Sequence, residues 1–349
     1  MNPLQETVTV VMDAAPGTGG QSITLPRRIG TVKIGDCIGR GGSGVVFSGY
    51  DDALKRSVAV KILHHLRGGA RELDRGRLID GVRNAARVRH EHLVMVHGVD
   101  LVGDFPVIVM EHVDGASLRD LLSARGQFDV ETALHLAREV CAGVDALHRE
   151  NIVHRDLKPA NVLIDRGGVA RVCDFGLACE VGGTAMARSD ENVAGSPLFM
   201  APEVFEGMVS PQGDVYAVGV LLFEMLAGRV PFDGDSIADV RDRHLHTDPP
   251  IDILAGAGVP DDLVELVGRC LNKQRIMRYK SAGHLLRALE EMPPRQRPDH
   301  VRARVADGVN SLGPGAKRAE ADRTPTPVAA NTYDMLSARA AAKRKHKPE

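Results

Sequence analysis

Residues 151–164 read NIVHRDLKPANVLI, and the rest of the chain can be interpreted outward from them. The stretch contains two short apolar runs, 152–153 and 162–164, each of which predicts a buried strand. Polar side chains of both signs are crowded between the runs: His154, Arg155, Asp156, Lys158 and Asn161. Charged side chains seldom enter a protein interior without partners. Their crowding at this place therefore requires a chemical explanation.

The composition limits the classes of protein to which such a stretch can belong. The chain has 349 residues, of which 43% are hydrophobic and 26% charged, enough for a sizeable core and more than one domain. The formal net charge is -2, so no overall field attracts the chain to nucleic acid or to an anionic membrane. We therefore expect no nucleic-acid partner, and we infer partners from specific sites.

The cysteines and the amino-terminal residues indicate the cellular compartment. Five cysteines are scattered along the chain without a C-x-x-C pair, which argues against a disulfide framework or a zinc site. The first residues lack the basic segment of a signal peptide, and the longest apolar stretch, 215–228, contains Glu224 and is too short to span a bilayer. We expect a cytoplasmic protein without a membrane span.

Three regions of the chain differ in composition. Residues 1–28, which include a glycine-rich run, predict a flexible leader. Residues 293–349, rich in Pro, Ala and Arg, predict a disordered basic tail. Residues 29–292 between them predict the folded domain.

The folded domain has two parts with different periodicity. The first, about 29–110, shows strand-like runs at 33–38, 45–50, 57–63, 93–99 and 107–110 and one helical stretch at 71–89. The second, about 114–292, shows helical periodicity from Ser117 onward. We therefore expect an α+β protein in which a small antiparallel sheet with one helix precedes a larger, mainly helical part.

A glycine-rich segment in the first part suggests a phosphate site. Gly39, Gly41 and Gly44 have G-x-G-x-x-G-x-V spacing between two strand-like runs, and glycine lets backbone N–H groups approach phosphate oxygens. A dinucleotide-binding fold is disfavoured, because a strand follows Gly44 where that fold needs a helix. A plain glycine-rich hairpin remains an alternative. Lys61, at the end of the strand-like V-A-V-K, supplies a cation that a phosphate site needs.

Further motifs follow in a fixed order. Asp174-Phe175-Gly176 comes after the opening stretch, and Ala201-Pro202-Glu203 comes later. The ordered set G-x-G-x-x-G-x-V, V-A-V-K, H-R-D-x-K-x-x-N, D-F-G and A-P-E resembles the eukaryotic-type Ser/Thr protein kinase family over roughly residues 30 to 290. The resemblance implies a bilobal protein kinase fold, and we expect a bacterial member.

The resemblance assigns a role to each crowded polar residue. Asp156 would orient the substrate hydroxyl and accept its proton, and Lys158 would follow the γ-phosphoryl group of ATP. Asn161 and Asp174 would share Mg²⁺, or Mn²⁺, through hard oxygen ligands. Lys61 would hold the α and β phosphates. His154 would be a packing residue against Phe175.

The resemblance also implies an adenine pocket and a regulatory segment. Residues 109–113 correspond to the hinge, with Met110 as gatekeeper and backbone groups of Glu111 and Val113 at adenine. Apolar residues around the ring would be Ile38, Val46, Ala59, Leu163 and Cys173. Arg155 suggests control by a phosphate on Thr184 or Ser189. Glu203 would pair with Arg278, and Ser196 would belong to the substrate platform.

One expected residue is missing. In the family a helix glutamate pairs with the strand lysine, and counting back from 89–90 puts Gly81 in its place. Counting forward from Lys61 gives Asp80, and Glu72 is a third candidate about two turns earlier. We favour Asp80, because Gly81 has no group that compensates a buried ammonium.

Several functions are compatible with these motifs. An active Ser/Thr kinase that phosphorylates protein substrates and itself, through a transient homodimer, keeps all of Asp156, Lys158, Asn161 and Asp174. A pseudokinase scaffold is the alternative, and a small-molecule kinase is a third interpretation. The His64-His65 and His244/His246 pairs are interpreted as surface residues rather than metal ligands.

Overall fold

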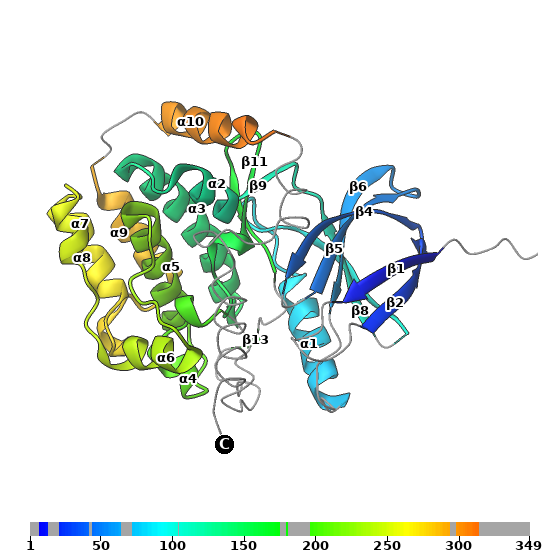
Figure 1. Ribbon diagram of the computed structural model, residues 1–349, viewed down its shortest axis with the longest axis horizontal. Coiled ribbons are helices and arrows are strands. Elements are labelled where there is room, and N and C mark those ends of the chain that lie inside the picture. Colours follow the sequence, from blue (N-terminus) through cyan, green and yellow to red (C-terminus); the bar gives the residue numbers. More distant parts are fainter. Residues whose placement is uncertain are drawn as a thin grey trace, which may run out of the picture.

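A computed structural model describes residues 7–12, 21–41, 44–63, 72–103, 105–174, 179–180, 196–293 and 298–313. These residues form a smaller lobe built on a sheet and a larger lobe built mainly from helices (Figure 1). The fold class expected from the sequence, an α+β bilobal kinase fold, is confirmed.

The smaller lobe contains a six-stranded antiparallel sheet of strand order β3-β4-β5-β6-β8-β7. Its strands are β3 (Arg28–Ile29), β4 (Val32–Gly41), β5 (Gly44–Asp51), β6 (Arg56–Leu63), β7 (Val96–Val102) and β8 (Phe105–Glu111), and the helix α1 spans Glu72–Ala85. Leu93 and Val94, expected at the start of a strand, instead lie beside Val172 of the larger lobe, where Leu93 forms an isolated bridge and the Val94 N–H donates to the Val172 carbonyl at 2.9 Å.

Alternation along β6 separates the core of the smaller lobe from the site. Val58, Val60 and Ile62 are fully buried in one cluster with residues of β4, β5 and β8. Ala59 and Lys61 point to the opposite face, because successive side chains of a strand alternate. Lys61 is thereby directed toward the larger lobe, although charged side chains are seldom buried.

The larger lobe is arranged around a buried helix. Its helices are α2 (Leu118–Arg125), α3 (Val130–Arg149), α4 (Pro202–Phe205), α5 (Pro211–Ala227), α6 (Ile237–His246), α7 (Asp252–Gly256), α8 (Asp261–Cys270), α9 (Ala282–Glu291) and α10 (Pro298–Ser311). Short 3-10 turns span Pro159–Asn161, Pro197–Phe199 and Arg275–Met277. α5 is buried from Gly213 to Leu226 and ends at Gly228, which is left-handed. A helix that is apolar on all sides fits only the centre of a lobe.

Short strands carry the site between the lobes. They are β9 (Gly115–Ser117), β10 (Ile152–Val153), β11 (Val162–Asp165), β12 (Ala170–Val172) and β13 (Cys179–Glu180). β11 pairs with β12 and β9, and β10 pairs with β13. The two apolar runs of the opening stretch are thus the buried strands that the sequence predicts.

Two expectations about the chain ends are corrected. Thr7–Met12 pairs antiparallel with Gln21–Pro26 as β1 and β2, within the segment expected to be a flexible leader. Residues 298–311, expected to be disordered, form α10, because Pro298 begins the helix and Val301, Val305 and Val309 are buried at a spacing of four residues. Residues 314–349 lie outside the described part.

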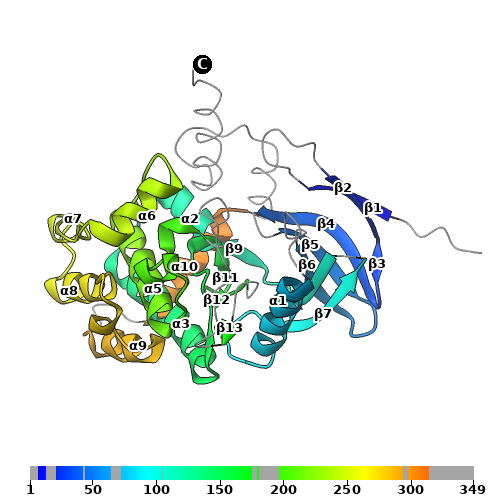
Figure 2. The ribbon, with the colours of Figure 1, turned by 90° about the horizontal axis from the view of Figure 1, so that it is seen from below.

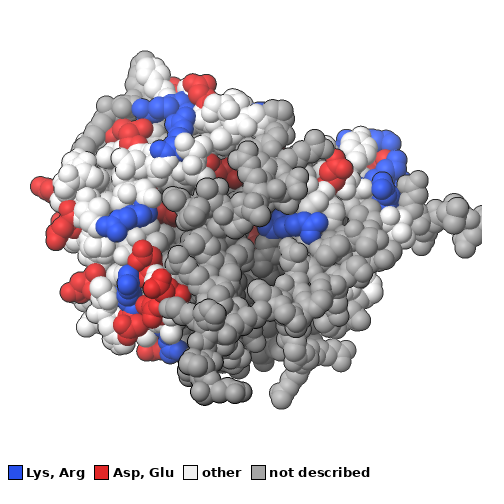
Figure 3. All heavy atoms as spheres, viewed as in Figure 1, with Lys and Arg blue, Asp and Glu red and all other residues white. Residues whose placement is uncertain are grey.

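Charge and hydropathy of the described surface are mixed. On the face in Figure 3, acidic and basic side chains are interspersed over the larger lobe. Within the described ranges, no helix is both long and apolar enough to cross a bilayer. Ligand recognition must therefore be derived from particular groups of residues rather than from overall charge or hydropathy.

Candidate active site

The loop between β10 and β11 brings two polar residues to one carboxylate. Asp156 Oδ2 accepts hydrogen bonds from Lys158 Nζ at 2.7 Å and from Asn161 Nδ2 at 2.9 Å. Asn161 Nδ2 also donates to the Asp156 carbonyl at 2.7 Å. Asp156 Oδ1 is buried and accepts no hydrogen bond from the described residues. One oxygen is therefore held rigidly, and the other is available to a hydroxyl donor.

A buried carboxylate from α5 holds the backbone of this loop. Asp214 accepts from the His154 N–H at 2.8 Å and from the Arg155 N–H at 2.9 Å. Arg155 adopts a positive φ of 72°, which costs free energy in a non-glycine residue and needs such outside support. Asp214 thereby fixes the conformation in which Asp156 points into the cleft.

His148 of α3 connects Asp214 to α9. Its Nδ1 accepts from the Ala282 N–H at 3.1 Å, so Nε2 carries the proton donated to Asp214 at 2.9 Å. Burial alone would raise the pKa of Asp214, but the His148 hydrogen bond and the neighbouring donors hold that pKa below its usual range. Asp214 therefore stays ionised as an acceptor for the loop.

An ion pair joins the two lobes at the cleft. Lys61 Nζ on β6 lies 2.6 Å from Asp174 Oδ2, which follows β12, and the two side chains are only 6% and 14% exposed. Burial would raise the pKa of Asp174, yet the charges of Lys61 and Lys158 keep that pKa far below its usual range. The contact therefore holds an ionised carboxylate of the larger lobe against the sheet of the smaller lobe.

His154 is a buried linker beside this contact. Its ring lies in the interior, with Nε2 at 3.0 Å from the Cys173 carbonyl, and Nδ1 accepts from the Asp156 N–H at 3.3 Å. Both ring nitrogens face backbone groups. The geometry therefore agrees with a packing residue and not with a general base, although Phe175 lies outside the described residues.

Apolar residues of the smaller lobe lie on the Lys61 face of the sheet. Val46 is the cross-strand partner of Lys61, and Ala59 is the partner of Met110, so all four side chains share this face. The Glu111 N–H donates to the Met95 carbonyl at 2.8 Å, and the Met95 N–H donates to Glu111 Oε2 at 3.3 Å, so Glu111 is fixed at the end of β8.

Three further expected pocket residues have compatible positions. Leu163 is partly exposed between the buried Val162 and Ile164 on β11, so it faces away from the core. Val113 is 7% exposed just after β8. Ile38 is half-buried on β4, next to the glycine-rich turn.

The glycine-rich hairpin joins β4 to β5. Gly41 pairs with Gly44, and residues 42–43 of its tip lie outside the described part. A Cβ at Gly44 would collide with the Ile62 carbonyl oxygen, whereas one at Gly39 would have its nearest contact at 3.8 Å. Close packing against β6 thus requires Gly44, independently of any phosphate.

The preference for Asp80 as the partner of Lys61 is wrong. The Asp80 side chain is 68% exposed and lies 3.5 Å from Arg83 on the same helix. α1 turns Gly81 and Val82 inward instead, and Val82 packs with Leu63 of β6. Lys61 reaches Asp174 across the cleft. The side chain of Glu72 lies outside the described part.

The region expected to form the substrate platform contains a buried ion pair. Arg278 donates to both carboxylate oxygens of Glu203, at 2.8 and 2.9 Å, as the resemblance implies. Its cation also lies over the ring of Tyr216, at 4.7 Å from the centroid. Ser196 is half-buried just before the 3-10 turn Pro197–Phe199.

The interpretation of His244 as a surface residue is wrong. It is fully buried among Phe205, Tyr216 and Phe232, and its Nδ1 lies 2.8 Å from the Tyr216 hydroxyl. Burial and the charge of Lys273 lower the pKa of His244 to about 3. His246 is exposed, 2.9 Å from Asp242. The expected positions Thr184, Ser189, His64 and His65 lie outside the described residues.

Sequence reasoning missed the supporting role of Asp214. None of the motifs considered above includes this residue. A carboxylate inside the otherwise apolar helix α5 was the available signal, because a buried charge must have partners. His148, one residue after Leu147 on the buried face of α3, carried no comparable signal.

The donor set suits a divalent cation. The side-chain amide Nδ2 of Asn161 donates to Asp156, and the amide oxygen of Asn161 remains as an acceptor. Together with the ionised Asp174 this offers hard oxygen ligands, which Mg²⁺ prefers. The described residues contain no cluster of three or more His, Cys, Asp or Glu that would suggest a different kind of metal site.

A glycine-rich hairpin and a lysine on one lobe, facing an Asp-Lys-Asn constellation and a second aspartate on the other, define the class of the protein kinases. Residues 32–288 match the family described as protein kinase domain, and the chain belongs to this family.

The relatives found are bacterial Ser/Thr kinases. The chain is 32% identical over 254 residues to the serine/threonine-protein kinase PrkC of Bacillus subtilis, covering 72% of this chain and 39% of the relative. It is 36% identical over 247 residues to PknL of Mycobacterium tuberculosis (70% and 61%). It is 32% identical over 285 residues to PknB of Mycobacterium leprae (78% and 45%). The matched region thus spans 39% to 61% of these relatives.

Proposed function

We propose that the chain is an active Ser/Thr protein kinase that transfers the γ-phosphoryl group of ATP to Ser or Thr hydroxyls of proteins, including its own. The observation that carries the proposal is the convergence of Lys158 and Asn161 on Asp156 Oδ2, with Oδ1 buried and unpartnered among the described residues. An acceptor hydroxyl supplies the donor that Oδ1 lacks. A scaffold without catalysis would have no need to keep Asp156, Lys158, Asn161 and Asp174 together.

The chemistry follows from the positions of these groups. The acceptor oxygen bonds to the γ-phosphorus while the bond between that phosphorus and the β-phosphate oxygen breaks. The hydroxyl proton passes to Asp156, and ADP leaves. Lys158, 2.7 Å from Asp156, offers positive charge beside the transferred group, and Lys61 holds the α and β phosphates.

Asn161 and Asp174 would hold Mg²⁺, or Mn²⁺ in its place. The ion would neutralise charge that develops on the phosphate oxygens. In this proposal the ATP site is formed by Ile38, Gly39, Gly41, Gly44, Val46, Ala59, Lys61, Met110, Glu111, Val113 and Leu163.

A phosphate on Thr184 or Ser189 would pair with Arg155 and order the segment after Asp174. A transient homodimer would let one copy phosphorylate the other, and the cytoplasm is the proposed location.

Transfer of radiolabel from γ-labelled ATP tests the proposal. The purified chain should label itself and a generic Ser/Thr acceptor with Mg²⁺ or Mn²⁺ present, and Asp156→Asn should remove nearly all labelling. Absence of transfer by the unaltered chain with both ions would favour the scaffold function. Mass spectrometry of the labelled chain should find phosphate on Thr184 or Ser189.

A further inference from the structure

The helix α10 lies beyond the residues that match the family and packs on the larger lobe. It lies beside α3, β11 and β9 in Figures 1 and 2. Val305 and Val309 belong to the same core cluster as α3 and α5, and both are 3% exposed. The helix is therefore fixed to the larger lobe by its valines and lies next to β9, which follows the expected hinge at residues 109–113.

The turn between β11 and β12 packs directly against α10. Gly168 in this turn has a φ of +82°, and a Cβ there would lie 2.5 Å from the Arg302 carbonyl oxygen and 3.1 Å from the Ala306 nitrogen. Arg166 donates to Asn310 Oδ1 at 3.1 Å, and Asn310 Nδ2 donates to the Arg166 carbonyl at 3.4 Å. The backbone of the turn thus rests directly on the backbone of the helix.

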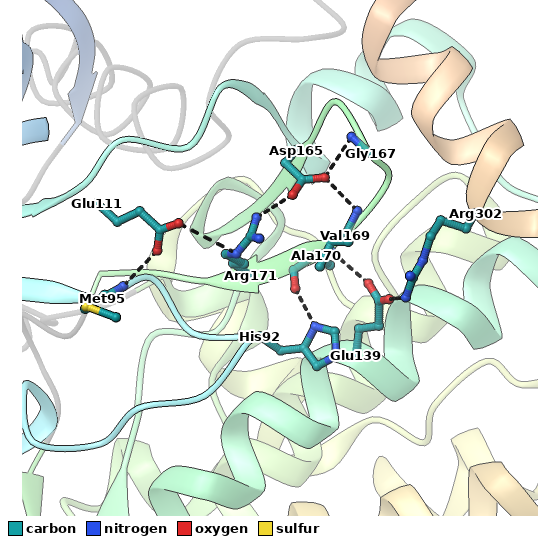
Figure 4. Close-up of polar contacts among 10 residues, drawn as sticks. All are labelled: His92, Met95, Glu111, Glu139, Asp165, Gly167, Val169, Ala170, Arg171 and Arg302. Atoms are coloured by element: carbon teal, nitrogen blue, oxygen red, sulfur yellow. Dashed lines mark hydrogen bonds and ion pairs between the residues drawn. The ribbon is translucent and has the colours of Figure 1, made fainter. Parts of the chain in front are cut away.

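The same turn holds the residues next to the hinge. The Arg166 N–H donates to the Asp114 carbonyl at 3.1 Å, and Arg166 Nε donates to Asp114 Oδ2 at 2.8 Å. Asp114 directly follows Val113. Arg171 reaches both Asp165, at 2.6 Å, and Glu111, at 3.9 Å, as Figure 4 shows. A shift of the turn would therefore move the segment that meets adenine.

A second connection runs through a buried carboxylate. Arg302 of α10 donates to Glu139 Oε1 at 3.0 Å, and Glu139 Oε2 accepts from the Ala170 N–H at 2.7 Å (Figure 4). Glu139 is 5% exposed, so loss of Arg302 would leave it, among the ion pairs of the described residues, with His135 at 3.5 Å alone, besides its hydrogen bond from the Ala170 N–H. The Ala170 carbonyl in turn accepts from His92 Nδ1 at 2.9 Å.

We propose that α10 is a positioning element of the nucleotide site, which sets the hinge through the β11–β12 turn. This inference rests on the proposed ATP site. Asn310 and Asp114 accept from different nitrogens of the same guanidinium, Nη1 and Nε of Arg166, so a change at Asn310 reaches the hinge through Arg166. The helix thereby acts on nucleotide affinity without touching nucleotide.

Nucleotide binding by full-length variants tests this role. Asn310→Ala and Arg302→Ala should each raise the Kd of a non-hydrolysable ATP analogue about fivefold, the size expected for one partly exposed charged or polar contact. The KM for a peptide acceptor should not change, and Arg302→Lys should recover part of the affinity. Asp307→Ala, exposed on the same helix, is the matched control. An unchanged Kd for both variants, with lower melting temperatures, would show that α10 only stabilises the lobe.

Hydrogen exchange separates this inference from the proposed function. Amides of residues 111–114 and 165–171 should exchange faster in Asn310→Ala than in Asp307→Ala, with no nucleotide present. If the unaltered chain failed to bind nucleotide, the kinase proposal would be wrong, but faster exchange in Asn310→Ala would still show that α10 positions residues 111–114. Equal exchange in the two variants would overturn the positioning role of α10.

Discussion

Lys61 is the side chain on which the cleft depends most directly. It contributes the cation on the smaller lobe and keeps the pKa of Asp174 low. We expect Lys61→Met to preserve the fold, because the replacement has similar length, and to reduce phosphoryl transfer by about 10²–10³-fold, the range for loss of one electrostatic stabiliser. Steady-state rates together with circular dichroism melting measure both effects. Near-normal turnover would mean that another cation holds the phosphates.

Asp80 provides the opposite case, a charged residue that the structure places in solvent. Its side chain is 68% exposed and contacts only Arg83 among the described ion pairs. Asp80→Ala should leave turnover within about twofold and the free energy of unfolding within about 0.5 kcal/mol, as for other surface substitutions. Urea unfolding and kinase assays beside the unaltered chain check this. A loss comparable to that of Lys61→Met would show that α1 rotates during turnover.

The pair of Glu203 and Arg278 ties α4 to the segment after α8. Arg278 also donates to the carbonyls of Asn272, Lys273 and Gln212, so its whole guanidinium is used. Arg278→Lys should lower the free energy of unfolding by about 3 kcal/mol, because lysine cannot form this fork and leaves Glu203 poorly compensated. Arg275→Lys, exposed in the preceding turn, is the control for denaturant unfolding. Equal midpoints for the two variants would contradict the importance of the fork.

The contact between α5 and α6 makes stability depend on pH. The pKa of His244 is about 3 in the folded chain, against an ordinary 6.5, because the ring is buried near Lys273. Between these values the unfolded chain binds a proton that the folded chain does not. The contribution of the neutral His244 to the free energy of unfolding should therefore be fully present above pH 6.5. Below that pH the free energy of unfolding should fall, by up to about 1.4 kcal/mol per pH unit from this group.

Two variants isolate that contribution. His244→Phe should flatten the pH dependence of unfolding between pH 6.5 and 4, although it also loses the Tyr216 hydrogen bond. His246→Gln, on the exposed face of α6, should retain the slope of the unaltered chain. Parallel curves for all three proteins would assign the acid sensitivity to other groups.

How far the sequence predicts these elements depends on the signal at each residue. The strand-like run Val58-Ala59-Val60-Lys61 identified β6, and because successive side chains of a strand alternate, Lys61 lies on the face opposite Val58 and Val60 although all of them are buried. The motif spacing located Asp156 and Asp174, but not the Asp214 bonds that shape the loop, because those join residues far apart in the chain. The basic composition around α10 concealed the valine spacing that buries it. Gly81 faces inward because of the way α1 packs on the sheet, and no local sequence pattern predicts that packing.

The site is assembled from both lobes, so a ligand in it should stabilise both together. Lys61 comes from the sheet, while Asn161 and Asp174 come from the larger lobe. ATP analogue with Mg²⁺ at 100 times its Kd should add about 2.7 kcal/mol to the free energy of unfolding, and the melting temperature should rise in a single transition. Lys61→Met and Asp174→Asn should lose most of this rise. Asp156→Asn should keep it, because in the proposed mechanism Asp156 serves the acceptor hydroxyl rather than the nucleotide. A rise confined to one of two separate transitions, or its loss in Asp156→Asn, would contradict this division of roles between the residues of the cleft.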